Sequence, residues 1–480
     1  MSAPKDSLIS ARSLAASAFS RAAGAPLIGG NSIRLLRNAE ANYAAWCDAI
    51  RSARRAIYFE NYIFRRDSTG RRFLDLLTAR AAAGVKVRLL LDWFGSLQTP
   101  WSFWKPLVSA GGEVRYHNPP FSKGSLSWLS RDHRKSLVVD GSIGFVSGVC
   151  VSDAWLGDEK RKIEPWRDTG VELRGPAVAD LAIAFAQVWA ENGPPIPGTG
   201  LPLPRPAVTG DVAVRVIATA PSITNVYRLD LLISAMAQER LWLTDAYFAG
   251  TGSYVQALRA AARDGVDVRL LVPGGSDLPW LRPLTTAGYL PLLDAGVRVF
   301  EWNGSMLHAK TAVADDRWAR VGSTNLNVAS WMTNFELDLA VEDEGFAKEM
   351  AEMYEHDLGH ATEVVLKKRK RVRLPNPKDT DGHSRPARGG LYRATAGALR
   401  FTRAVSTAVI HQRVLGQQDM RALVIAAVLL LALAVIAIIF PRFCAWGAAG
   451  ITLAIAALLI YRVVCERRTR KPPEDVEPPA

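Results

Sequence analysis

The stretch that decides the fold is "LHAKTAVADD", residues 307–316, in which a histidine, a lysine and an aspartate are set among small apolar residues. A second stretch, "DHRKSLVVDG" at residues 132–141, repeats the same spacing. The motif residues are His133, Lys135 and Asp140 in the first copy and His308, Lys310 and Asp315 in the second. Because a motif of this length rarely recurs by accident, the chain is expected to hold two related halves.

The repeat extends well beyond the two motifs. "GVKVRLLLD" at residues 84–92 recurs as "GVDVRLLVP" at 265–273, and "AIYFENYIF" at 56–64 corresponds to "RLWLTDAYF" at 240–248. The offset between the copies drifts from segment to segment, which is typical of an old duplication with loop changes and not of a short solenoid repeat.

Each half reads as alternating helices and strands. Residues 41–55 and 70–84 have helical periodicity, the β-branched run at 85–92 reads as a buried strand, and the runs at 136–140 and 311–315 read as strands. This alternation predicts an α/β fold with two duplicated α/β/α sandwich lobes. The predicted domains are a first lobe at 31–191, a Pro/Gly-rich linker at 192–211 and a second lobe at 212–365.

Composition limits the class of partner. The 480 residues carry a formal charge of +13, which suits nucleic acid or an acidic membrane surface. Four scattered cysteines form neither a disulfide framework nor a zinc motif and fit a reducing compartment. Residues 1–30 show no signal peptide and are expected to be a mobile leader, with a weak amphipathic membrane contact as the alternative.

The C-terminal part predicts a membrane anchor. Residues 422–440 and 443–461 are two uncharged apolar runs of 19 residues, so we expect a transmembrane hairpin at 421–465; a buried helical hairpin is the alternative. Basic residues gather at its outer ends, which places both termini and the catalytic lobes in the cytoplasm, with 466–480 as a cytoplasmic tail. The basic segment 366–420 is expected to lie on the acidic leaflet, unless it packs on the lobes.

Two histidines suit double displacement at phosphorus. One imidazole can attack a phosphodiester and form a phosphohistidine, while the other protonates the departing oxygen and then deprotonates an alcohol or water. Lys135 and Lys310 can hold the charged oxygens, since residues i and i+2 of a strand share a face. Asp140 and Asp315 complete the catalytic motifs, although their strand-end position favours a structural role at the turn. No metal and no cofactor is expected.

Further polar residues follow each motif. Ser323 and Asn325 are placed to donate to a phosphate. Each histidine needs a partner for its second ring nitrogen, and we expect Glu336 to orient His308 and Asp168 to orient the histidine of the first half.

Together these residues resemble the phospholipase D superfamily, which is marked by H-x-K-x4-D twice, G-S-x-N after the second copy and N-x-E beyond it. Within it, "YIFRRDSTGRRFLDLL", "LLLDWFGS", "HRKSLVVDGSIGFVSG" and "PWRDTGVELRGPAV" are similar to bacterial cardiolipin synthases, especially the type without N-terminal membrane helices. The resemblance runs from about residue 31 to 365, and the paired motifs are strong evidence.

The resemblance implies two lobes with the active site between them and a phosphatidyl-histidine intermediate that is transferred to phosphatidylglycerol. It implies His133 as the nucleophile and His308 as the acid/base, an assignment that the near two-fold symmetry leaves open. The implied phosphate-binding residues are Lys135, Lys310, Ser147, Ser323 and Asn325. The implied partners are phosphatidylglycerol, other anionic phospholipids and the bacterial inner membrane, and the oligomeric state is left open.

The chain departs from the family at Cys150, which stands in "VSGVC" where the family usually has asparagine. A thiol is a poor donor, so this half-site is expected to hold phosphate less well, and a small packed residue is the favoured interpretation. The predicted hairpin is C-terminal, whereas many family members carry theirs at the N-terminus.

Other functions stay open from sequence alone. A hydrolytic phospholipase D would use the same residues with water as the acceptor. A nucleic-acid phosphodiesterase is compatible with the charge, but the predicted hairpin and the lack of a recognisable nucleic-acid-binding module count against it, so no nucleic acid partner is expected. A non-enzymatic scaffold is disfavoured because both His/Lys pairs are intact.

Overall fold

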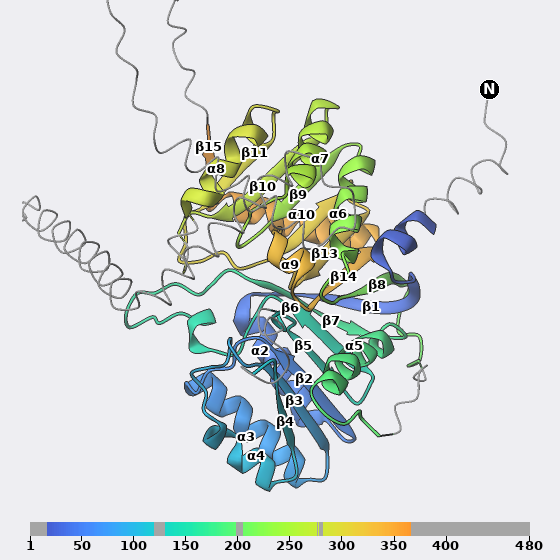
Figure 1. The fold of residues 1–480 in the computed structure, drawn as a ribbon, viewed down its shortest axis with the longest axis vertical. Helices are drawn as coiled ribbons and strands as arrows, with labels where there is room; N and C mark the ends of the chain where they lie inside the picture. Colours follow the sequence, from blue (N-terminus) through green and yellow to red (C-terminus); the bar gives the residue numbers. More distant parts are fainter. Residues whose placement is uncertain (1–16, 120–129, 198–204, 276, 278–281, 366–480) are drawn as a thin grey trace, which may run out of the picture. The chain divides into compact units, whose positions relative to one another are not determined.

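The protein has an α/β fold built on one large mixed sheet (Figure 1). The computed structural model describes residues 17–119, 130–197, 205–275, 277 and 282–365. The strands are β1 (Ile28–Arg37), β2 (Ala56–Asn61), β3 (Lys86–Asp92), β4 (Glu113–His117), β5 (Ser136–Val139), β6 (Ile143–Ser147), β7 (Thr169–Arg174), β8 (Val212–Thr219), β9 (Arg240–Thr244), β10 (Asp267–Pro273), β11 (Arg298–Trp302), β12 (Thr311–Ala314), β13 (Trp318–Gly322), β14 (Glu336–Glu342) and β15 (Ala361–Val364).

Helices lie in many of the connections between these strands, while β5 and β6, and β12 and β13, are joined by short turns. The α-helices are α2 (Asn38–Ser52), α3 (Ser68–Ala82), α4 (Lys105–Ser109), α5 (Val178–Glu191), α6 (Asn225–Met236), α7 (Gly252–Arg263), α8 (Arg282–Leu293), α9 (Val328–Met332) and α10 (Glu344–Leu358). The described residues also include the 3-10 helices η1 (Trp101–Trp104) and η3 (Asp153–Trp155). These elements confirm the α/β class that the alternation of patterns predicts.

The strand order is nearly palindromic about one seam. The 15 strands run β15-β11-β10-β9-β12-β13-β14-β8-β1-β7-β6-β5-β2-β3-β4, so each half of the chain repeats the same pairings on its side of β8 and β1. These two strands pair antiparallel, with Ile28 opposite Val214 and Asn31 opposite Val212. The side-chain amide of Asn31 donates to the carbonyls of Ile28 at 2.7 Å and Val212 at 3.1 Å, so the seam is hydrogen-bonded.

The directions of the strands place the two histidine motifs at equivalent ends of the two halves of the sheet. In the first half β2, β3 and β4 are parallel, and β5 runs against β2 with Ser136 opposite Glu60. In the second half β12 runs against β9 in the same way, with Thr311 opposite Thr244. Each H-x-K segment therefore lies where the parallel strands end, the edge at which α/β sheets place ligands.

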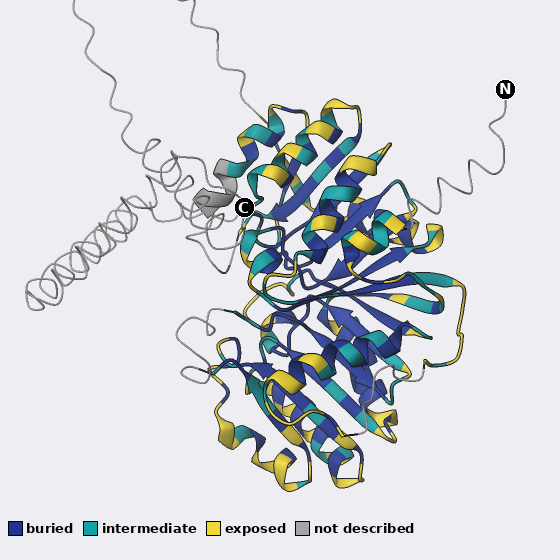
Figure 2. Cartoon of the chain, turned by 45° about the vertical axis from the view of Figure 1, so that its right-hand side comes forward, coloured by how far each residue is buried: buried dark blue, intermediate teal, exposed yellow. Residues whose placement is uncertain are grey.

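The strands of the sheet are largely buried (Figure 2), and apolar side chains from helices and strands pack against one another in the core. In the first half Trp46 of α2 packs edge-to-face on Phe59 of β2 at 5.8 Å and on Phe73 of α3 at 6.1 Å. Such pairs add about 0.5–1.5 kcal/mol each to the area they bury. The helix α3 begins at a cap in which the Asp67 carboxylate accepts the Gly70 N–H at 3.0 Å.

The first described residues differ from the leader predicted for 1–30. Residues 28–30 belong to β1, and Ala23 and Ala25 are buried in the core of the second half. The Arg215 guanidinium donates to Ser20 Oγ at 2.7 Å and to the Ala25 carbonyl at 3.1 Å. Because these contacts tie residues 20–30 to β8, the prediction of a mobile leader is wrong for that stretch.

The predicted anchor is not covered by these elements. Residues 366–420, the hairpin at 421–465 and the tail at 466–480 lie outside the described residues. No helix within the described ranges combines the length and the apolar character needed to cross a bilayer.

Candidate active site

The backbone joins each histidine motif to the other half of the chain. The His133 N–H donates to the Phe335 carbonyl at 2.9 Å, and the His308 N–H donates to the Arg167 carbonyl at 2.7 Å. Each acceptor stands directly before the acid of the opposite half. Short parallel bridges at these points therefore bring the acid of one half to the imidazole of the other.

The imidazoles are paired with carboxylates crosswise. His133 Nδ1 lies 3.1 Å and 3.0 Å from the two carboxylate oxygens of Glu336, and His308 Nδ1 lies 2.8 Å from Asp168 Oδ2. The sequence prediction found both acids but paired each with the histidine of its own half, and that pairing is wrong. It assumed that neighbours in sequence are neighbours in space, whereas the bridges at Phe335 and Arg167 cross between halves.

Burial fixes the protonation of both pairs. Burial, followed by the charge of Lys310, lowers the pKa of His308 to about 3, and burial lowers the pKa of His133 despite its carboxylate partner. Burial alone would raise the pKa of Asp168, but contacts with His308 and Lys310 outweigh it and hold the value at about 2. The pKa of Glu336 is lowered likewise, against the effect of burial, by contact with His133. Each Nδ1–H thus donates to an ionised carboxylate, which leaves Nε2 with a free lone pair.

Two buried lysines supply positive charge. The ammonium groups of Lys135 and Lys310 donate to the carbonyls of His133, at 2.6 Å, and of His308. Burial, helped by the charge of Lys135 and opposed by that of Asp168, lowers the pKa of Lys310 to about 8. The charge of each lysine also lowers the pKa of the histidine in the other half. The two half-sites therefore act on one another electrostatically and form one cationic site suited to an anion.

Aromatic rings that the sequence reasoning missed surround the imidazoles. The rings of Tyr62 and His133 meet edge-on at 4.9 Å. His308 contacts Trp155 at 5.4 Å, Trp166 at 5.7 Å and Tyr247 at 6.0 Å. The signal for the tyrosines was present, because Tyr62 and Tyr247 follow the duplicated strands. These rings hold the imidazoles in place and keep water away.

The predicted phosphate-binding groups are unequal. The Ser323 hydroxyl donates to Glu336 Oε2 at 2.5 Å and accepts the Leu337 N–H at 3.0 Å, while Ser147 Oγ accepts the Val149 N–H at 3.1 Å. Both hydroxyls are thus engaged inside the protein. The side-chain oxygen of Asn325 is buried without a hydrogen-bond partner among the described residues.

Cys150 is fully buried at the position that corresponds to Asn325 in the repeat, and burial raises the pKa of its thiol. A neutral thiol at this place offers at most a weak hydrogen bond. Across the described residues, no group of three or more His, Cys, Asp or Glu side chains is arranged to hold a metal ion.

Asp140 does not reach the imidazoles and caps the start of a neighbouring strand. Its carboxylate accepts the backbone N–H groups of Arg54 at 2.8 Å, Arg55 at 2.7 Å and Ala56 at 2.9 Å. Its backbone has a positive φ of 54°, which an aspartate at a tight turn tolerates. These contacts agree with the structural role expected at the turn, and the place of Asp140 among the catalytic residues stays a prediction.

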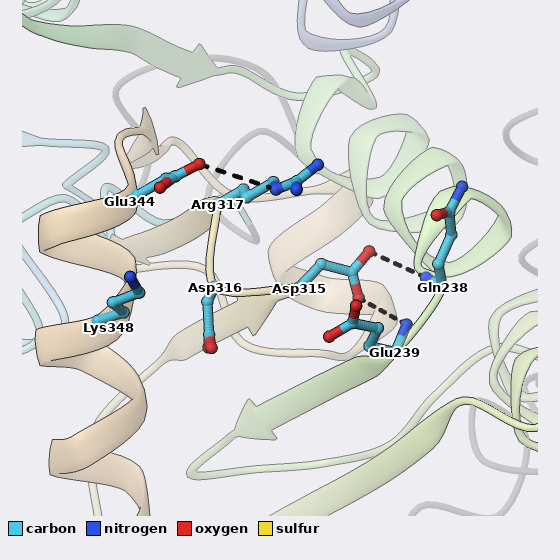
Figure 3. A pocket seen from close by; sticks show the side chains of 7 residues that line it. All are labelled: Gln238, Glu239, Asp315, Asp316, Arg317, Glu344 and Lys348. Carbon is cyan, nitrogen blue, oxygen red and sulfur yellow. Dashed lines mark hydrogen bonds and ion pairs between the residues drawn. The ribbon is translucent and has the colours of Figure 1, made fainter.

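Asp315 repeats this arrangement in the second half. It accepts N–H groups from Gln238 at 2.9 Å, Glu239 at 2.8 Å and Arg240 at 3.0 Å. Asp315 lines a polar surface hollow of about 240 Å³. Figure 3 shows its carboxylate turned toward the backbone of Gln238 and Glu239. Six residues of extended chain separate Asp315 from His308, a span of roughly 20 Å. The place of Asp315 among the catalytic residues likewise stays a prediction.

Comparison with known proteins agrees with this geometry. Residues 46–155 and 232–358 match the family model described as "Cardiolipin synthase, PLD-like domain". Cardiolipin synthase A of Pseudomonas aeruginosa is 37% identical over 356 residues, which cover 72% of this chain and 71% of that protein. A cardiolipin synthase of Alkalihalophilus pseudofirmus is 31% identical over 346 residues, 71% of this chain and 68% of that protein.

A solved structure shares the fold. The crystal structure of phosphatidylserine synthase from Haemophilus influenzae superposes with a TM-score of 0.57 at 16% identity, covering 72% of this chain and 91% of that one. With two matched segments that carry the two histidines and relatives above 30% identity over most of their length, the chain belongs to the cardiolipin synthase family of phospholipase D-type phosphatidyltransferases.

Proposed function

We propose that this protein is a cardiolipin synthase that moves a phosphatidyl group from one phosphatidylglycerol to the free hydroxyl of a second and releases glycerol. The observation that carries the proposal is the pair of buried imidazoles, each held at Nδ1 by an ionised carboxylate of the other half and each beside a buried lysine. Relatives named cardiolipin synthase support the choice of substrate.

In the first step Nε2 of His133 attacks phosphorus, the phosphorus–oxygen bond to glycerol breaks, and His308 gives its proton to that oxygen. Burial keeps His308 neutral in the free protein. The bound phosphodiester brings a negative charge that offsets the two lysines and raises the pKa of His308, so that His308 takes up a proton when substrate binds.

In the second step neutral His308 removes the proton from the hydroxyl of the second phosphatidylglycerol. That oxygen attacks phosphorus, the phosphorus–nitrogen bond breaks, and His133 returns with a free Nε2. His308 again carries the proton, so the cycle is balanced. Lys135 and Lys310 hold the phosphoryl oxygens in both steps, and we assign Asn325, Ser147 and Ser323 to the same phosphate.

The site is proposed to lie between two lobes, 31–191 and 212–365, joined by the linker 192–211. The near-palindromic strand order supports this division. We further propose that the lobes face the cytoplasm at the bacterial inner membrane, held there by the hairpin 421–465 and the basic segment 366–420. Two uncharged runs of 19 residues with basic residues at their outer ends support this placement.

The test is to give the purified full chain phosphatidylglycerol in mixed micelles and to separate the lipids. Cardiolipin and glycerol in equal amounts are expected. Phosphatidic acid without cardiolipin would overturn the proposal, because water would then be the acceptor. His133→Ala and His308→Ala should each abolish product, and Asp140→Asn is the matched control that should keep it.

A further inference from the structure

The segment after β3 turns large apolar side chains into solvent. Within residues 93–104, Phe94 is 58% exposed, Leu97 is 56% exposed and Trp101 is 51% exposed. Isolated exposed apolar residues are ordinary, but three within eight positions that include two aromatic rings form a patch that calls for a partner. We call Phe94, Leu97 and Trp101 the apolar patch.

The backbone under the patch is firmly anchored. Ser96 Oγ donates to the Tyr62 carbonyl at 3.1 Å, and Thr99 Oγ1 donates to the Phe64 carbonyl at 2.5 Å. A side chain at Gly95 would meet the Tyr62 carbonyl at 2.2 Å, so the loop lies directly on the strand end. Because these hydrogen bonds fix the backbone of the loop, the exposure of its aromatic rings is a property of the folded structure.

One buried carboxylate connects the patch to the catalytic histidine. Asp92 Oδ1 accepts the N–H groups of Phe94 and Gly95, both at 2.9 Å, and Asp92 Oδ2 accepts the N–H of Asp132 at 2.9 Å. Asp132 directly precedes His133. The patch is thus built on the same end of the sheet as the active site.

The surroundings of the patch are cationic. Lys105 directly follows this segment, and Arg65 and Arg66 follow Phe64, whose carbonyl accepts the hydrogen bond from Thr99. In the described part of the chain none of these three cations takes part in an ion pair. Aromatic side chains flanked by unpaired cations suit the interface of an anionic bilayer, where rings sit at headgroup depth and bases meet phosphates.

We propose that Phe94, Leu97 and Trp101 are a docking surface that seats the catalytic end of the protein in a bilayer containing anionic glycerophospholipids. The inference rests on the proposed function, since a site for a bilayer lipid must approach the bilayer. The patch enters the interface, Arg65, Arg66 and Lys105 bind headgroup phosphates, and the lipid headgroup rises beside the patch to His133.

Photocrosslinking of the unmodified full chain tests the contact directly. The protein is placed in nanodiscs of phosphatidylethanolamine and a phosphatidylglycerol that carries a diazirine near the glycerol end of one acyl chain. Trypsin then releases residues 89–115, because Lys105 precedes a proline, and the control peptide 229–240, which holds the exposed Met236. Adducts at residues 94–101 with none on the control peptide support docking. Adducts absent from 94–101, or equally frequent on both peptides, overturn it.

Kinetics provide the second test. The variant Phe94→Ser/Leu97→Ser/Trp101→Ser should need roughly tenfold more phosphatidylglycerol, as mole fraction in micelles, for half-maximal rate, with an unchanged maximal rate. The matched control is Val208→Ser/Met236→Ser/Leu290→Ser, which removes three comparably exposed apolar side chains elsewhere. An unchanged mole-fraction dependence, or an equal shift in the control, contradicts docking.

The two proposals fail separately. A wild-type chain that crosslinks at residues 94–101 but makes no cardiolipin contradicts the proposed reaction and keeps the docking surface. A wild-type chain that makes cardiolipin but crosslinks only elsewhere contradicts the docking surface and keeps the reaction.

Discussion

The half-site of His133 and the half-site of His308 share a backbone plan and differ in what surrounds it. His308 is enclosed by three aromatic rings, whereas the described contacts of His133 include the ring of Tyr62. Asn325 stands in the second half, and Cys150 occupies the corresponding position in the first. The H-x-K segments are alike, so the inequality arises in the residues that follow them.

The two acids are also held differently. Asp168 accepts N–H groups from Trp155 at 2.9 Å and Thr169 at 2.8 Å, whereas Glu336 accepts the Ser323 hydroxyl and the Asn334 amide. A carboxylate fixed by two firm N–H donors remains ionised and keeps its imidazole in one orientation. The comparison teaches that a near two-fold frame can hold two chemically distinct histidines, as a nucleophile and an acid/base require.

The largest loss of turnover is expected when either of the two histidines is removed. His133→Ala should lower turnover by about 10⁴ or more, and His308→Ala by on the order of 10²–10⁴, because in the proposed mechanism the first variant loses the nucleophile and the second loses the acid. A phosphatidyl donor with a p-nitrophenol leaving group needs no protonation. It should restore the first step, measured as nitrophenol release, in His308→Ala but not in His133→Ala. Rescue of His133→Ala instead would reverse the two roles.

The crosswise pairing predicts the next largest effect. Asp168→Asn and Glu336→Gln should each cost on the order of 10³ in turnover, because the amide favours the wrong imidazole tautomer. Nitrophenol release from the activated donor should be nearly the same in the double variant Asp168→Asn/His308→Ala as in His308→Ala alone. The double variant Glu336→Gln/His308→Ala should still lose its full factor of about 10³. If Glu336→Gln, and not Asp168→Asn, left the rate of His308→Ala with the activated donor unchanged, each acid would orient the histidine of its own half.

The basic limb of the pH profile should follow Lys310. Its pKa of about 8 means that the charge is present below that pH and is lost as pH rises through it. We expect kcat/KM to fall above about pH 8, by up to roughly tenfold per pH unit. Lys310→Arg keeps its charge and should remove the limb, even if its maximal rate is lower. If kcat/KM of Lys310→Arg still fell above the same pH, the fall would come from the titration of another group.

The two positions that differ between the half-sites should have unequal weight. Asn325→Cys should raise KM about tenfold through the loss of a hydrogen bond to phosphate, with a smaller change in kcat. Cys150→Ser should change either constant less than about twofold, since a small buried residue is replaced by one of similar size. Steady-state kinetics of both variants measure KM and kcat. A larger change in Cys150→Ser than in Asn325→Cys would mean that the half-site of Asn325 binds phosphate more weakly than the half-site of Cys150.

The smallest effect on turnover is expected at the strand-end aspartates. Asp140→Ala and Asp315→Ala each remove acceptors for three N–H groups and should lower the free energy of unfolding by about 1–2 kcal/mol. Turnover at a temperature where the protein stays folded should change less than about twofold. Denaturant unfolding and an activity assay distinguish this from a catalytic role, which would lower turnover without lowering stability.

Local patterns predicted the elements of the fold well. The strand predicted at 136–140 is β5, the strand predicted at 85–92 is β3, and the helix predicted at 41–55 is α2 with bounds shifted by three residues. These succeed because periodicity and β-branched runs are local properties. The duplication also predicted that the two halves of the sheet repeat one another, because similar sequences form similar strand pairings.

The errors came from contacts that cross the chain. The pairing of Asp168 with His308 depends on the bridge between Arg167 and Leu307, which no local pattern records. The early start of β1 depends on its pairing with β8 far along the sequence. Trp155 and Trp166 reach His308 from the other half, so sequence could show neither ring as part of the site.

The crosswise carboxylates bear on how such a protein arose. An ancestor with a single motif would have lacked a complete centre as a monomer, but two copies related by a dyad would have completed it, each subunit lending its acid to its partner across an isologous interface. A homodimer must make every substitution twice, once in each copy. Fusion into one polypeptide ended that constraint, and it allows Cys150 to stand opposite Asn325.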